Sequence, residues 1–267
     1  MITLEIKNKD GAVVASARGE RIAHTCERAY AEGDFLSVTA EGGHLVTQLD
    51  GALTESMIYL PSGTLKYTIP FGEKRAAYGE NAFAGAGRVV KVRYAAEEEI
   101  RAYRNIALNS ADKRGPAACY PHATANFVTR DESVFEERNA IDGHTKTDGH
   151  GSFPYQSWGG GAREDLDYKL DFGRTVEADK IVFYLRADYA GDHDTYWRSL
   201  TVELSDGTVI PAEFQKTGEP QTVSLGGKKS IEWLRLTNFK QAAMPLSWAA
   251  LTEIEVYGAD AVCPAKR

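Results

Sequence analysis

The chain has 267 residues, of which 43% are hydrophobic and 26% are charged, proportions typical of globular proteins. This length suits one large domain or two small ones, and we expect two. Its 38 acidic and 31 basic residues give a net charge of -7, and the basic residues form no stripe that could neutralise phosphates. The composition therefore excludes nucleic acid as an expected partner and makes an anionic membrane an unfavourable one.

The chain opens on an alternating, strand-like run and not on a basic region followed by an apolar one, and no stretch has spanning length. We therefore expect a cytoplasmic protein, or an extracellular one if an export signal has been removed. The chain has an odd number of cysteines, Cys26, Cys119 and Cys263, and they show no CxxC spacing. This predicts reduced, mostly structural thiols.

The first part of the chain shows short runs in which apolar residues recur at every second position, as in strands. Turn signals such as Asp10-Gly11, Asp50-Gly51 and Pro61-Ser62-Gly63 separate these runs. The pattern predicts an N-terminal β-sandwich over residues 1 to 95, of unknown role. The alternating apolar residues are Ile2, Leu4 and Ile6; Leu36 and Val38; Leu65, Tyr67 and Ile69; and Val90, Val92 and Tyr94.

Residues 96 to 102 are rich in helix formers and acidic residues, and we place a linker there. Beyond it, seven further strand-like runs predict a second all-β domain over residues 103 to 260, followed by a tail at 261 to 267. We assign Trp233, inside one of these runs, to the core. The runs are 168 to 172, 181 to 185, 200 to 204, 209 to 214, 222 to 225, 231 to 236 and 253 to 257.

A long segment from Asn105 to Gly161 shows little periodicity. It is rich in aromatic and histidine residues, which argues against disorder because aromatic side chains supply buried area. We expect an ordered loop with one or two helical turns, and long ordered loops are usually functional.

Several short motifs follow one another in the second domain in a characteristic order. They are Asn105-Ile106-Ala107-Leu108-Asn109, Asn139-Ala140-Ile141-Asp142-Gly143, Gln156-Ser157-Trp158, Leu166 to Gly173, Lys180 to Tyr184, Val202 to Gly207 and Leu251 to Gly258. In this order they resemble the discoidin, or coagulation-factor C-type, family, a galactose-binding-like fold related to carbohydrate-binding modules. The resemblance implies an eight-stranded jelly roll whose loops at one end form the ligand site.

The same resemblance implies a structural calcium ion, held by the acidic residue of the Asp142-Gly143 loop and by Glu253 in the last strand. Calcium takes six to eight oxygen ligands, so Thr147 or Thr145 and nearby carbonyl groups would complete the set. The alternative is an ordinary Asp-Gly turn beside a surface glutamate.

A sugar site needs an aromatic platform ringed by polar side chains, so loop residues of both kinds are the candidates. The resemblance places a sugar-contacting basic residue just after the strand that ends at Leu185, where this chain has Arg186. Around it we group loop residues, and each of them could instead serve packing or local hydrogen bonding. They are His122, His150, Tyr155, Trp158, Asp188, His193, Trp197 and Trp248.

These features predict a glycan-binding protein, with sugar identity and oligomeric state left open. A first alternative is a lyase-type enzyme, with Tyr155 or a histidine as the base and Arg186 neutralising a carboxylate. The absence of GxSxG, HExxH and phosphate-cradling motifs favours a non-catalytic protein. A second hypothesis is a protein or membrane adhesion module. A third is a transition-metal site at His122, His144 and His150, whose loose spacing is unlike a helix-based ligand pair.

Overall fold

The strands of the N-terminal half form where apolar residues alternate, as β1 illustrates. Its residues Ile2, Leu4 and Ile6 are fully buried, while their neighbours are partly exposed. The computed structural model describes residues 1–163, 165–188, 195–242 and 248–261, and in this half it contains eight strands. They are β1 (Ile2–Lys7), β2 (Val13–Gly19), β3 (Arg21–Cys26), β4 (Phe35–Thr39), β5 (Gly43–Gln48), β6 (Ser56–Leu60), β7 (Thr64–Thr68) and β8 (Arg88–Tyr94).

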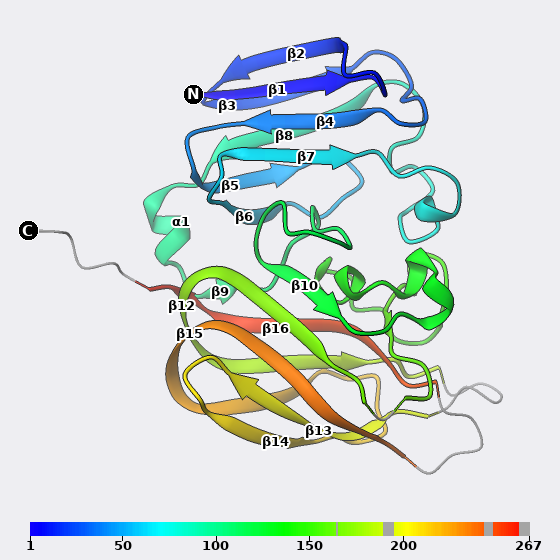
Figure 1. Cartoon of the computed structure of the whole chain (residues 1–267), viewed down its shortest axis with the longest axis vertical. Coiled ribbons are helices and arrows are strands. Elements are labelled where there is room, and N and C mark those ends of the chain that lie inside the picture. Colours follow the sequence, from blue (N-terminus) through cyan, green and yellow to red (C-terminus); the bar gives the residue numbers. More distant parts are fainter. Residues whose placement is uncertain (164, 189–194, 243–247, 262–267) are drawn as a thin grey trace, which may run out of the picture.

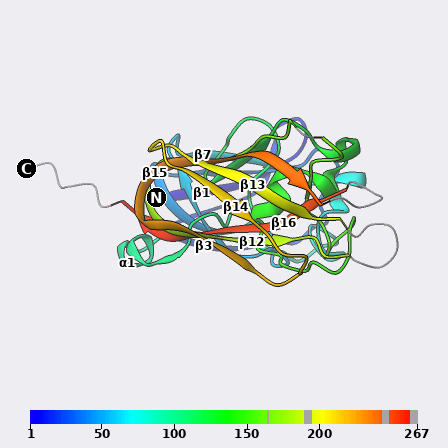
Figure 2. The same cartoon turned by 90° about the horizontal axis from the view of Figure 1, so that it is seen from below.

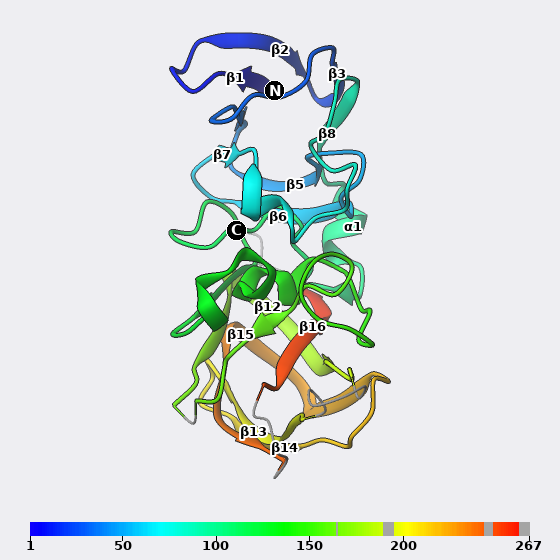
Figure 3. The same ribbon diagram turned by 90° about the vertical axis from the view of Figure 1, so that its right-hand side faces the viewer.

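These strands make two antiparallel sheets, in the orders β2-β1-β4-β7 and β3-β8-β5-β6. The sheets face each other, with β7 and β8 on opposite sides of the sandwich (Figure 3). Apolar side chains from both sheets meet in one hydrophobic cluster between them. The predicted N-terminal β-sandwich is therefore confirmed as an architecture.

The helix-favouring segment contains the one α-helix of the described residues, α1 (Glu97–Arg101). Arg93 of β8 donates two hydrogen bonds of 2.7 Å to the Glu99 carboxylate, which also accepts the Ala96 amide at 2.8 Å. The helix is thereby tied to the preceding sandwich. Within the described residues, no helix is long and apolar enough to cross a membrane.

The C-terminal half is built on one antiparallel sheet of eight strands that curls around its own core (Figure 1). The strand order is β11-β16-β12-β15-β13-β14, and in addition β9 pairs with β16 and β10 pairs with β12. Figure 2 shows β12 and β16 side by side. The predicted all-β fold is confirmed here as well. The strands are β9 (Arg104–Asn105), β10 (His122–Ala125), β11 (Trp158–Gly159), β12 (Tyr168–Leu185), β13 (Trp197–Leu204), β14 (Val209–Glu213), β15 (Gln221–Gln241) and β16 (Ala250–Asp260).

The long segment before β12 lies between the N-terminal sandwich and the eight-stranded sheet (Figures 1 and 3). It contains three short 3-10 helices, η2 (Thr129–Asp131), η3 (Ser133–Phe135) and η4 (Glu137–Ile141), in addition to β10 and β11. Another 3-10 helix, η1 (Gly72–Arg75), follows β7. The long segment is ordered as expected, but it has three helical turns instead of one or two and also contributes two short strands.

The two hydrophobic clusters do not divide where the sequence suggests a linker. Five residues beyond position 103 pack into the N-terminal cluster, and they are Ala111, Cys119, Val128, Val134 and Phe135. Backbone hydrogen bonds of 2.7 and 2.9 Å also join Tyr59, on the edge strand β6, to Tyr120. Side chains from beyond residues 96 to 102 thus pack against the N-terminal sandwich, so the predicted domain boundary at these residues stays a prediction.

Candidate functional site

Arg186 stands directly after β12 and is held by the start of β16. Its amide donates to the Ala250 carbonyl at 3.0 Å, and its guanidinium Nη2 donates to the Trp248 carbonyl. The residue is only 4% exposed, and burial lowers the pKa of its guanidinium, an effect that the nearby Asp188 opposes. Nε of Arg186 is buried and has no hydrogen-bond acceptor in the described part of the chain.

Arg186 lines a pocket of about 90 Å³ at the end of the C-terminal sheet where β12 ends and β16 begins. The indole of Trp248 is 37% exposed at this pocket and is one of the few large hydrophobic side chains in the described residues that face solvent. His150 lines the same pocket, and its Nδ1 lies 2.5 Å from Oδ2 of Asp188. The structure thus gathers an aromatic face, a guanidinium and an imidazole-carboxylate pair.

Besides His150, the long loop segment contributes Thr129, Arg130, Phe135 and Gly159 to the lining of this pocket. Arg130, with φ of 52°, lies with its guanidinium 5.1 Å from the Phe135 ring and bonds to Glu132 at 2.7 and 2.9 Å. Thr129 donates to the Gly159 carbonyl at 2.8 Å, which joins the η2 turn to β11. The sequence reasoning missed Arg130 because it lies in a segment without periodicity, where no spacing marks it.

Tyr155 supports the pocket without lining it. A side chain at Gly149 would begin 2.6 Å from the Tyr155 ring, so the ring lies directly against the backbone that precedes His150. Nζ of Lys146 lies 5.5 Å from the centre of the same ring. We infer that Tyr155 orders the His150 loop.

Three predicted ligand residues belong to the interior. Trp158 and Trp197 are 0% and 1% exposed and pack against each other and Phe239, so neither indole can face a sugar. His122 is 5% exposed, and its Nδ1 lies 2.7 Å from Asp112. The prediction that Trp158, Trp197 and His122 contact a ligand is therefore wrong. The two indoles pack in the core, and the imidazole is paired with a buried carboxylate.

His193 lies outside the described residues, as does Cys263. Cys26 and Cys119 are buried free thiols, and burial raises the pKa of Cys119 to about 12. Trp233, assigned to the core, is half-buried on the outer surface, with Lys169 5.5 Å from its ring centre.

Asp142 and Glu253 are neighbouring buried carboxyl groups. The Gly143 amide donates to Glu253 Oε1 at 3.1 Å, while Asp142 accepts the His144 amide at 3.0 Å and the Gln156 amide group at 2.8 Å. Burial raises the pKa of both groups, and repulsion from Asp142 raises that of Glu253 further. Glu253 Oε2 is buried and unpartnered among the described residues.

The donor types at this place fit calcium, because two hard carboxylates lie together with one oxygen unpartnered. Thr147 is the third predicted ligand, and its carbonyl accepts the Ala187 amide at 2.8 Å while its hydroxyl lies 3.4 Å from the Gly218 carbonyl. In the described residues no group of three or more His, Cys, Asp or Glu side chains forms a metal site, so further ligands would have to be hydroxyl, carbonyl or water oxygens. The predicted set of Asp142, Thr147 and Glu253 stays a proposal. His122, His144 and His150 form no such group either.

No protein-family model matches the sequence, and a search of characterised proteins finds no match. The structure is similar to several solved carbohydrate-binding modules. A chitosan-binding module of a Paenibacillus chitosanase/glucanase is 18% identical, with a TM-score of 0.39 over 58% of this chain and 99% of the module.

Two further similar structures are a family 32 module of Clostridium perfringens NanJ in complex with galactose and a fucose-binding module of Streptococcus pneumoniae. Each is 15% identical, with a TM-score of 0.39. The matches cover 51% and 59% of this chain, and 91% and 99% of the modules.

Proposed function

We propose that the chain binds a glycan through the pocket formed by Trp248, Arg186 and His150. The observation that carries this proposal is the exposed Trp248 indole beside a guanidinium whose Nε has no partner among the described residues. A sugar ring has an apolar face that an indole can cover and hydroxyl groups that guanidinium and imidazole groups can bind. The small volume suits one terminal sugar residue, with the rest of the glycan outside.

The test is a glycan array with the purified chain, followed by titration of a bound glycan against three variants. We expect Trp248→Ala to weaken binding by at least about tenfold and Trp248→Phe to keep most of the affinity, because phenylalanine retains an aromatic face. Trp233→Ala removes a half-buried indole that does not line the pocket, so it serves as the matched control.

Silence across the array, or equal weakening by Trp248→Ala and Trp233→Ala, overturns this proposal. Mass spectrometry of the bound glycans distinguishes binding from catalysis. Cleavage that Tyr155→Phe abolishes would favour the lyase-type alternative, in which the phenol takes part in proton transfer.

We further propose that a calcium ion is held by Asp142, Glu253 and Thr147 and braces the loop that carries His150. Two buried carboxyl groups with raised pKa values are costly to ionise together, and a divalent cation would offset that cost. The Thr147 carbonyl accepts the amide of Ala187, the residue after Arg186, so an ion bound by Thr147 would also brace this side of the pocket.

Calcium should therefore raise the melting temperature of the wild type, by roughly 2 to 4 °C for each kcal/mol of stabilisation in a chain of this size. Glu253→Gln resembles the protonated carboxyl group, so we expect similar stability without calcium and no response to it. Glu255→Gln changes a more exposed carboxylate of the same strand and should keep the response. An unchanged response in Glu253→Gln contradicts the assignment.

A further inference from the structure

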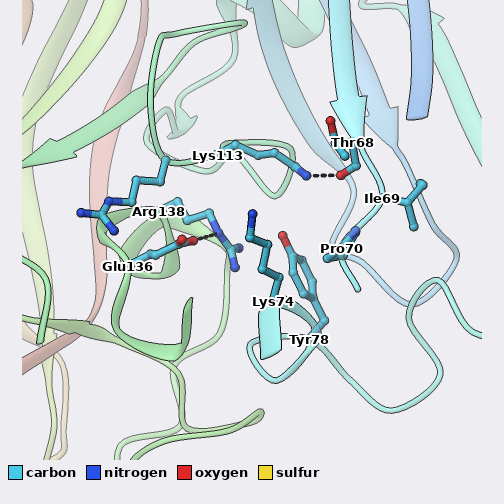
Figure 4. A pocket seen from close by; sticks show the side chains of 9 residues that line it. Thr68, Ile69, Pro70, Lys74, Tyr78, Lys113, Glu136 and Arg138 are labelled. Atoms are coloured by element: carbon cyan, nitrogen blue, oxygen red, sulfur yellow. Dashed lines mark hydrogen bonds and ion pairs between the residues drawn. The ribbon is translucent and has the colours of Figure 1, made fainter. Parts of the chain in front are cut away.

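A second and larger hollow lies at the junction of the two sandwiches, away from the Trp248 pocket. It has a volume of about 240 Å³ and lies between the end of β7, η1 and the long loop segment. Figure 4 shows the side chains of Lys74, Lys113 and Arg138 directed toward it together with the Tyr78 hydroxyl. None of these residues belongs to the proposed glycan site or to the proposed calcium site.

The lining of this junction pocket is strongly unbalanced in charge. The lining has four cationic side chains, those of Lys74, Lys113, Arg114 and Arg138, and one carboxylate, that of Glu136. Arg114 is paired with Asp131, which does not belong to the lining. Glu136 accepts a 2.8 Å hydrogen bond from Arg138 Nε, which leaves the lysines without a carboxylate from the lining. The pocket therefore presents a net positive potential to any molecule that enters.

The cationic groups are held in place by aromatic rings and backbone carbonyls. Lys113 Nζ lies 3.9 Å from the centre of the Tyr67 ring and donates to the Thr68 carbonyl. Arg138 is 4% exposed and lies 4.6 Å from the centre of the Tyr78 ring. Tyr67 and Tyr78 are joined through their hydroxyl oxygens, 3.1 Å apart, so the wall is organised without a ligand.

Assembling these cations costs stability in the empty pocket. Burial, together with the charges of Arg138 and Lys74, lowers the pKa of Lys113 to about 7, and Glu136 opposes them. Buried cations that lack counter-charges are usually relieved by pairing, and strongly perturbed groups in a hollow are candidates for ligand contacts. An oxyanion between Lys74, Lys113 and Arg138 would supply the missing negative charge.

We propose that the junction pocket binds a small oxyanion, either free or carried on a single acidic sugar. The tetrahedral phosphate and sulfate groups and the planar carboxylate share the chemistry that ammonium and guanidinium donors recognise. The volume lies below the roughly 300 to 1,000 Å³ of sites for drug-sized ligands, which limits the occupant to about one ring. Ile69 and Pro70 provide an apolar surface at the edge of the pocket.

The experiment is calorimetric titration of the full chain at low ionic strength with inorganic phosphate, sulfate, glucuronate and, as a neutral comparison, glucose. We expect the anions to bind and glucose not to. Lys74→Gln, at an exposed position, should weaken binding at least fivefold. Lys91→Gln, on an exposed position of β8 outside the pocket, should leave it unchanged.

A further readout is proton uptake at pH 7.5, measured by repeating the titration in buffers of different ionisation enthalpy. Lys113 faces Lys74 of η1, Tyr67 of β7, Arg138 of η4 and Glu136 directly before η4. An added anion should therefore raise the pKa of Lys113 and draw in a proton. Phosphate and sulfate binding without glucuronate would identify a tetrahedral oxyanion site, and binding of all three a general one. No binding of any anion up to about 10 mM, roughly 3 kcal/mol of affinity, or equal weakening by Lys91→Gln, would falsify the proposal.

Discussion

At the scale of single residues, the charged form of Lys113 is expected to lower the free energy of unfolding, because it is buried beside other cations. An ordinary lysine titrates near pH 10.4, but burial and the neighbouring cations Arg138 and Lys74 lower the pKa of Lys113 to about 7. The unfolded chain therefore binds one more proton than the folded chain between about pH 7 and pH 10. It follows that this residue's contribution to the free energy of unfolding rises with pH across that window and is most unfavourable below it.

Replacing the charge should accordingly stabilise the fold. We expect Lys113→Met to raise the free energy of unfolding by about 1 to 2 kcal/mol at pH 6, with a smaller difference at pH 9. Urea unfolding at the two pH values measures it, and Lys91→Met on exposed β8 is the control, with no expected pH-dependent difference. A destabilised Lys113→Met at pH 6 would show that its contacts with Tyr67 and Thr68 outweigh the cost of the buried charge.

At the scale of elements, the period-two pattern predicted where strands lie but not how far they continue. The predicted runs at 168 to 172 and 181 to 185 form the single strand β12, and those at 222 to 225 and 231 to 236 form β15. Irregular pairing in β12 begins near Gly173, whose φ of 65° gives the strand a bend without ending it. In a sequence, a glycine between two apolar runs indicates a turn that ends a strand. Here Gly173 lies inside one long strand and allows it to bend.

The same irregularities explain why Trp233 was placed on the wrong face. The pairing between β12 and β15 shifts between Ile231 and Trp233, and burial then follows Leu234 and Leu236. A shift of one residue moves every following side chain to the other face of the sheet. Alternation alone does not reveal such a shift, so the position of one tryptophan could not be predicted.

The candidate pocket was predictable only in part, for a related reason. Arg186 and Trp248 were recognisable as loop residues beside strand ends, and His150 as a loop residue. The antiparallel pairing of β12 with β16 brings the two strand ends together. Arg130 joins them through a left-handed turn in a loop without periodicity. The burial of His122 could not be predicted, because its partner Asp112 lies ten residues away in an irregular segment where no sequence pattern indicates such a pair.

At the scale of the whole molecule, the long loop segment lines both pockets and also packs against the N-terminal sandwich. Phe135 lines the Trp248 pocket, and the next residue, Glu136, lines the junction pocket. Val134 and Phe135 also pack into the N-terminal hydrophobic cluster. The geometry of both proposed sites therefore depends on how firmly the two sandwiches are joined.

Asp260, at the end of β16, is the centre of that connection. It accepts hydrogen bonds from His44 of β5 at 2.9 Å, from Arg104 of β9 at 2.8 Å and from Arg174 of β12. Burial alone would raise the pKa of Asp260, but these partners hold it well below its usual range. One carboxylate thus joins the N-terminal sandwich to three strands of the C-terminal sheet.

We expect Asp260→Asn to lower the free energy of unfolding by about 3 to 5 kcal/mol, because it leaves two largely buried arginines without their carboxylate. Since the folded pKa is depressed, the stabilisation by Asp260 is present above about pH 4 and is lost as the pH falls below that value. Asp165→Asn removes an exposed carboxylate paired with Arg163 and should cost far less, because solvent screens exposed ion pairs. Equal losses in the two variants, measured by urea unfolding at pH 7, would mean that packing of the long loop segment, and not this ion cluster, holds the sandwiches together.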